Sequence, residues 1–129
     1  MEKLRRATED YLKTIYLLGG SQLRVRCVDI ANQLGISRAS VSVAVKRLCD
    51  EGYLVSDATH QVRLTECGLA VAQNTLEKNQ TIRALLLDFG VDEENADRDA
   101  CLIEHDISPA SFAAMQDWWS RRQQEERTE

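Results

Sequence analysis

Apolar residues recur every three or four positions at the start of the chain, a spacing that places them on one face of a helix. The pattern predicts a helix over 3–18, which the pair Gly19 and Gly20 ends. Its apolar positions are Leu4, Ala7, Tyr11, Ile15 and Leu18.

A helix-turn-helix pattern follows this first helix. The segment 28–34 predicts a short helix, Gly35 a tight turn, and Ser37 the N-cap of a third helix that ends near Gly52. Short strands at 53–55 and 61–64 then flank a polar tip, which predicts a β-hairpin wing.

The second half of the chain has helical patterning only. Thr65 can cap a long helix that Gly90 ends, Asp92 a helix that reaches His105, and Ser108 a last helix with proline at its first position. Residues 121–129 form a charged tail that we expect to fray. The sequence therefore predicts a mainly α protein with a winged helix-turn-helix domain over 1–64 and a helical domain over 65–129.

Charge is divided between these two parts. The net charge is −5, but residues 1–64 hold ten Lys and Arg against seven Asp and Glu, and residues 65–129 hold six against fourteen. A positive balance of +3 over the first part suits contact with DNA phosphates, because phosphate attraction depends on local charge.

The outer face of the third helix is the candidate DNA-binding surface. Val41, Ala44, Val45 and Leu48 share one side and are expected to pack on the domain. Small and polar side chains on the other side permit close approach to the major groove of double-stranded DNA. An ordinary solvated helix face is the alternative explanation. The candidate DNA-binding residues are Ser37, Arg38, Ala39, Ser40, Ser42, Val43, Lys46 and Arg47.

Cys101, Glu104 and His105 form a candidate metal site. Offsets of three and four residues place the three side chains on one helix face, and thiolate, carboxylate and imidazole are all ligands of transition metals. The alternative is a packed thiol beside a hydrophilic helix end, where a histidine favours the negative pole.

Several classes of protein are excluded by what the sequence lacks. No apolar run approaches the roughly 20 residues of a membrane span, and the charged N-terminus does not resemble a signal peptide, so we expect a cytoplasmic protein with no membrane partner. The four cysteines have no C-x-x-C spacing and are expected to stay reduced. No catalytic triad, phosphate loop or H-E-x-x-H motif is present, so we expect neither enzyme activity nor a small-molecule substrate.

Together these segments resemble the diphtheria-toxin-repressor family of metal-dependent transcriptional regulators, especially its short manganese-transport-regulator branch. The resemblance implies a homodimer whose metal-bound form fits a palindromic operator, without the SH3-like domain of longer relatives. The segments that carry it are 8–16, 28–55, 64–65, 90–94 and 100–105.

The same resemblance implies a ligand set, with Asp10 of the first helix added to the later cluster. Lys13 and Asn79 stand where the manganese branch has further ligands, and since neither is as good a ligand, one principal ion per subunit is expected. Glu9, Asn79 and water are the candidates for completing the shell. The implied metal ligands are Asp10, Cys101, Glu104 and His105.

The expected function is a metal-dependent repressor of metal-ion uptake or homeostasis genes, activated by Fe(II) or Mn(II). Zn(II), Co(II) and Ni(II) are acceptable to this ligand set in vitro, because thiolate favours softer ions. The alternative is a winged-helix regulator that responds to oxidation of Cys101 or Cys49 in place of a metal.

Overall fold

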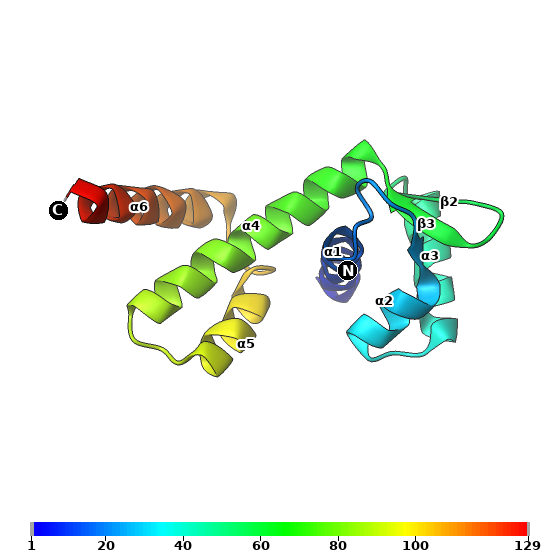
Figure 1. The fold of residues 1–129 in the computed structure, drawn as a ribbon, viewed down its shortest axis with the longest axis horizontal. Helices are drawn as coiled ribbons and strands as arrows, with labels where there is room; N and C mark the ends of the chain where they lie inside the picture. The colour runs from blue at the N-terminus through cyan, green and yellow to red at the C-terminus, as the bar shows by residue number, and fades with distance from the viewer. Residues whose placement is uncertain (1, 129) are drawn as a thin grey trace. The chain divides into compact units, whose positions relative to one another are not determined.

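The computed structural model describes residues 2–128. The first residue of the first expected domain and the last residue of the second therefore lie outside the described range. Within that range the chain forms six helices and a three-stranded sheet (Figure 1). The expected fold class, a winged helix-turn-helix domain followed by a helical domain, is confirmed. In chain order the elements are α1 (Glu2–Leu17), β1 (Val25–Arg26), α2 (Cys27–Leu34), α3 (Arg38–Asp50), β2 (Leu54–Ser56), β3 (Gln61–Leu64), α4 (Glu66–Asp88), α5 (Glu93–Ile103) and α6 (Pro109–Thr128).

The chain divides into two compact units, residues 1–74 and residues 75–129. The helix α4 starts in the N-terminal unit and ends in the C-terminal unit. Among the described residues no helix is both long and apolar enough to span a membrane.

The core of the N-terminal unit joins α1, α2, α3 and the sheet. Six of its larger side chains are completely buried. Burying aliphatic side chains of this size stabilises the fold by about 1.5–3 kcal/mol each. Ile15, Val41 and Leu48 come from positions that the sequence places inward, whereas Leu12 was not among them. The six side chains are Leu12, Ile15, Ile30, Val41, Leu48 and Val62.

The turn between α2 and α3 has the chemistry that the sequence predicts. Gly35 ends α2 in the left-handed conformation with φ 67°, which costs glycine little because it has no Cβ. The hydroxyl of Ser37 then accepts a hydrogen bond from the backbone N–H of Ser40 and caps α3. The start of the candidate DNA-binding helix is therefore fixed locally.

The sheet has the order β1-β3-β2, with both pairs antiparallel. The strands β2 and β3 form the expected wing, with Val55 opposite Arg63. The strand β1 was not predicted. Its two residues, Val25 and Arg26, pair with β3. A strand of this length is too short to show an alternating pattern in the sequence.

The C-terminal unit packs α5 and α6 with the second half of α4. Ala96 and Ala100 on α5 are completely buried, and their small side chains allow helices to approach closely. Ile82, Leu85 and Phe112 supply larger buried side chains.

Two boundaries in this unit differ from expectation. The helix α5 ends at Ile103, and Glu104 is its C-cap, so His105 lies in the following turn. The charged tail is helical, because α6 continues to Thr128. The guanidinium of Arg122 lies 2.9 Å from the carboxylate of Asp88 on α4, which joins α6 to α4.

Candidate DNA-binding surface and metal site

The two faces of α3 differ as the sequence predicts. The four side chains expected to face inward are all buried, and they are Val41, Ala44, Val45 and Leu48. The opposite face is open, and Val43 is 73% exposed. Seven of the eight candidate DNA-binding residues are exposed, namely Ser37, Arg38, Ala39, Ser40, Ser42, Val43 and Lys46.

Arg47, the eighth candidate, lies differently. Its side chain is only 26% exposed and is engaged within the N-terminal unit. The guanidinium donates to the Thr8 hydroxyl at 3.1 Å and to the Glu51 carboxylate at 3.2 Å. These contacts give Arg47 a role in packing α3 against α1.

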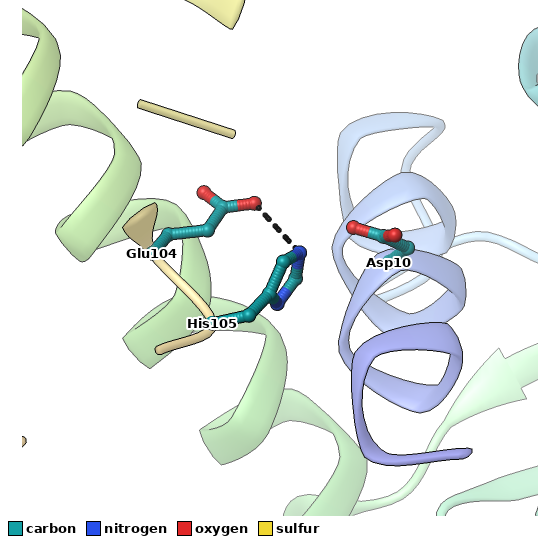
Figure 2. A group of neighbouring side chains, drawn as sticks. All are labelled: Asp10, Glu104 and His105. Atoms are coloured by element: carbon teal, nitrogen blue, oxygen red, sulfur yellow. Dashed lines mark ion pairs between the residues drawn. The ribbon is translucent and has the colours of Figure 1, made fainter. Parts of the chain in front are cut away.

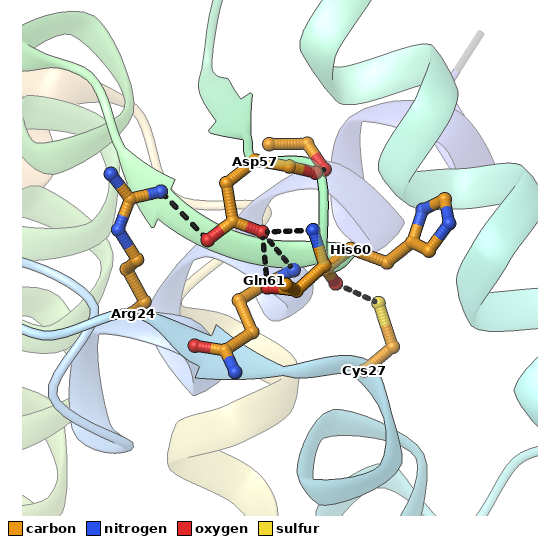
Figure 3. Close-up of polar contacts among 7 residues, drawn as sticks. Arg24, Cys27, Asp57, His60 and Gln61 are labelled. Carbon is orange, nitrogen blue, oxygen red and sulfur yellow. Dashed lines mark hydrogen bonds and ion pairs between the residues drawn. The ribbon is translucent and has the colours of Figure 1, made fainter.

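The wing is held together by the carboxylate of Asp57 (Figure 3). This carboxylate accepts hydrogen bonds from the Thr59 hydroxyl at 2.6 Å, the Thr59 N–H at 2.9 Å and the Gln61 N–H at 3.0 Å. Arg24 donates to its other oxygen at 2.9 Å. The Thr59 hydroxyl contributes most to lowering the pKa of Asp57, to about 2, because these donors stabilise the charged form.

The wing tip is also tied to the start of α2. The Cys27 thiol donates to the backbone carbonyl of His60 at 3.4 Å, and His60 itself has φ 62° (Figure 3). A left-handed backbone is uncommon for a residue other than glycine and fits the tight turn here. His60 is thus a wing residue.

A cavity of about 740 Å³ lies between α2, α3 and the wing. Its lining includes Arg26 together with two candidate DNA-binding residues, Arg38 and Lys46. Sequence reasoning did not select Arg26.

In the C-terminal unit, Glu104 and His105 form the centre of the candidate metal site. The two residues are only 1% and 4% exposed, and Oε1 of Glu104 lies 3.4 Å from Nε2 of His105 (Figure 2). Both residues therefore present a ligand atom at one buried place. Figure 2 also labels Asp10, which is a half-buried residue of α1 in the N-terminal unit.

Cys101, the remaining implied ligand, lies on α5 one turn before Glu104 and is exposed. Its sulfur does not belong to the close group of ligand atoms that includes Glu104 and His105. Instead, the Nδ2 atom of Asn79 on α4 lies 3.4 Å from this sulfur.

The other cysteines are free thiols, and two of them are poorly suited to oxidation chemistry. Burial raises the pKa of the Cys27 and Cys49 thiols, and for Cys49 the nearby charge of Asp50 adds to this effect. Because the thiolate is the reactive form, a raised pKa makes a thiol less reactive at neutral pH.

Comparison with known proteins gives matches to two consecutive family models. Residues 3–60 match the N-terminal DNA-binding domain of the iron-dependent repressors. Residues 65–126 match the metal-binding and dimerisation domain of the same repressors.

Individual relatives agree with these matches. An uncharacterised HTH-type transcriptional regulator of Methanocaldococcus jannaschii is 34% identical to this chain over 107 residues. The match covers 81% of this chain and 86% of that regulator. The HTH-type transcriptional regulator MntR of Lysinibacillus sphaericus is 32% identical to this chain, and the match covers 84% of this chain and 78% of that regulator.

Solved structures share the fold. The manganese regulator SloR superimposes with a TM-score of 0.76 at 25% identity over 88% of this chain, which spans about half, 53%, of that longer chain. The resemblance inferred from the sequence is confirmed. The chain belongs to the iron-dependent repressor family of metal-responsive, DNA-binding transcriptional regulators.

Proposed function

We propose that the protein is a homodimeric, metal-activated repressor that controls metal-ion uptake or homeostasis genes by binding a palindromic operator. The proposal includes no catalytic role and keeps the cytoplasmic location expected from the sequence. It also keeps a functional boundary after Leu64, with residues 65–129 as the linker and the metal-binding part. The observation that carries it is the buried pair Glu104 and His105 in a chain that also has an open, polar α3 surface.

The chemistry of the proposed ligands fits a divalent transition metal. A carboxylate and an imidazole that are almost completely buried are costly unless they pair or bind a metal. We propose that Asp10 and Cys101 complete the ligand set with Glu104 and His105. Two carboxylates suit Fe(II) and Mn(II), and the thiolate also admits Zn(II), Co(II) or Ni(II) in vitro.

When bound, the ion supplies the positive charge that holds these ligands together. Asp10 belongs to α1, whereas the other three ligands belong to the C-terminal unit. Ligands from both units would restrict the freedom of the DNA-binding domains, so the dimer would lose less conformational entropy on meeting DNA. A coupling of about 1–3 kcal/mol changes operator affinity about 5- to 150-fold.

Subunit contact is supported by apolar surface in the C-terminal unit. Four large apolar side chains there are exposed, and their burial in a subunit contact would be favourable. This unit also contains the segment 85–119, to which we assign the dimer contact. The exposed side chains are Phe89, Leu102, Ile103 and Trp118.

The test is binding of the promoter upstream of the protein's own gene, with and without each ion, at fixed salt concentration. Metal should raise the operator affinity of the parent protein, and Glu104→Gln should remove most of this gain. Glu126→Gln is the matched control, because Glu126 is an exposed carboxylate on α6. A metal response in Glu104→Gln equal to that of the parent would refute the ligand assignment.

The same assay separates the thiol-oxidation alternative. If peroxide changed operator affinity while chelator and metal did not, Cys101 would act as an oxidation sensor. The raised pKa of the Cys49 thiol disfavours that residue for the role.

A further inference from the structure

The side chain of Asn79 is the feature of the C-terminal unit that the ligand set does not explain. It lies on α4, and its amide nitrogen faces the Cys101 sulfur on α5 at 3.4 Å. A second contact joins the same two helices, in which Arg83 donates to the Asp97 carboxylate. Arg83 follows Asn79 by four residues and Asp97 precedes Cys101 by four, so the two contacts are one helical turn apart on each helix.

Packing keeps the two helices in this register. Ala96 and Ala100 are completely buried on α5, and Ile82 is almost completely buried on α4. Buried side chains on both helices limit how far one helix can move along the other. The amide of Asn79 is therefore held at the Cys101 sulfur by the fold of this unit.

An amide N–H can only donate a hydrogen bond, and a thiolate sulfur can only accept one. A hydrogen bond to a charged acceptor is stronger than one between neutral groups, so this contact can orient a metal-bound thiolate. It also withdraws electron density from the sulfur. Groups that hydrogen-bond to metal ligands orient them and tune the metal in this way.

We propose that Asn79 is a positioning residue for Cys101: it orients the thiolate and weakens its electron donation, and it is not itself a metal ligand. This inference rests on the proposed function, because it assumes that Cys101 binds the metal. It assigns a role to the position where the resemblance to the manganese branch places a histidine ligand.

The experiment uses Co(II) as a probe, since a thiolate bound to Co(II) gives a charge-transfer absorption band in the near ultraviolet. The full-length parent should show this band, and Cys101→Ser should lose it. Asn79→Ala should keep the band but shift it to longer wavelength, because a sulfur without the hydrogen bond gives up electron density more easily. Its Co(II) affinity should fall about tenfold, the lower end for loss of such a supporting contact.

Asn79→Asp separates positioning from ligation. A carboxylate cannot donate a hydrogen bond and repels a thiolate, so a positioning role predicts weaker Co(II) binding than in the parent. A direct ligand role predicts tighter binding, because carboxylate is a better ligand than an amide. Tighter binding would overturn the inference.

Gln80→Ala is the matched control, because it removes an exposed side-chain amide from the next position of the same helix. It should leave the band and the affinity unchanged. If Asn79→Ala behaved like Gln80→Ala, the inference would be wrong while the proposed function stood. If the parent itself gave no charge-transfer band, Cys101 would not be a ligand and the proposed ligand set would fail. Alanine favours helices, so folding of both alanine variants is expected and is checked by circular dichroism.

Discussion

Replacing Lys46 by alanine tests the assignment of the outer face of α3 to DNA. Each phosphate contact contributes about 0.9 to the slope of the logarithm of affinity against the logarithm of salt concentration. Loss of one contact in each subunit of a dimer should therefore reduce the slope by about 1.8. When salt rises from 50 to 200 mM, the operator affinity of the variant should therefore fall by a factor about tenfold smaller than that of the parent. Because Lys46 is exposed, the free energy of unfolding should stay within about 0.5 kcal/mol.

Arg47→Ala is the matched comparison, since the neighbouring residue carries the same charge but contacts Thr8 and Glu51. Its loss should leave the salt slope nearly unchanged. The free energy of unfolding should instead fall by about 1 kcal/mol, the usual net contribution of a partly exposed hydrogen bond.

Fluorescence anisotropy of a labelled operator duplex, titrated with protein at several potassium chloride concentrations and saturating Mn(II), measures the slopes. Urea unfolding measures stability in the same variants. The reasoning would be refuted if Lys46→Ala kept the slope of the parent, or if Arg47→Ala lowered it as much as Lys46→Ala.

Two further predictions concern the wing and its base. In Gly68→Ala the new Cβ would lie 2.1 Å from the Tyr53 carbonyl oxygen, so backbone must shift and the free energy of unfolding should fall by about 1–3 kcal/mol in a urea titration. The folded-state pKa of Asp57 is about 2, below the ordinary value of 3.8. The charged carboxylate therefore stabilises the wing fully when the pH is above 3.8, and this stabilisation is lost as the pH falls towards 2. A carboxyl NMR titration should show that Thr59→Ala raises this pKa more than Arg24→Ala does, and the reverse order would contradict the assigned causes.

The parts of the fold that local chemistry determines could be predicted from the sequence. Ser37 can cap a helix wherever it precedes one, and the inward spacing of Val41 and Leu48 needs only the helical period. Thr65 caps α4 in the same local way, because its hydroxyl accepts a hydrogen bond from the Gly68 N–H three residues later. These interactions join residues that are close in the chain, so a pattern in the sequence records them.

Features that depend on distant residues could not be predicted. The strand β1 exists because β3 pairs with it, and the contact of Arg122 on α6 with Asp88 on α4 joins residues far apart in the chain. For the metal site, the spacing places Glu104 and His105 together, but nothing in the sequence shows that Asn79 faces Cys101. That contact follows from the packing of α4 against α5.

The separation of buried and open faces on α3 has a consequence for how such a regulator can diversify. Substitutions at Ala39, Ser42 or Val43 change no buried contact, because these side chains point outward, whereas Ala44 and Val45 hold the helix in place. On the proposed assignment of this face to DNA, operator preference could drift, or be engineered, without weakening the buried contacts that hold the helix. In a synthetic gene circuit, the C-terminal unit could be kept while only the outward residues of α3 are exchanged, so that the protein binds a new promoter.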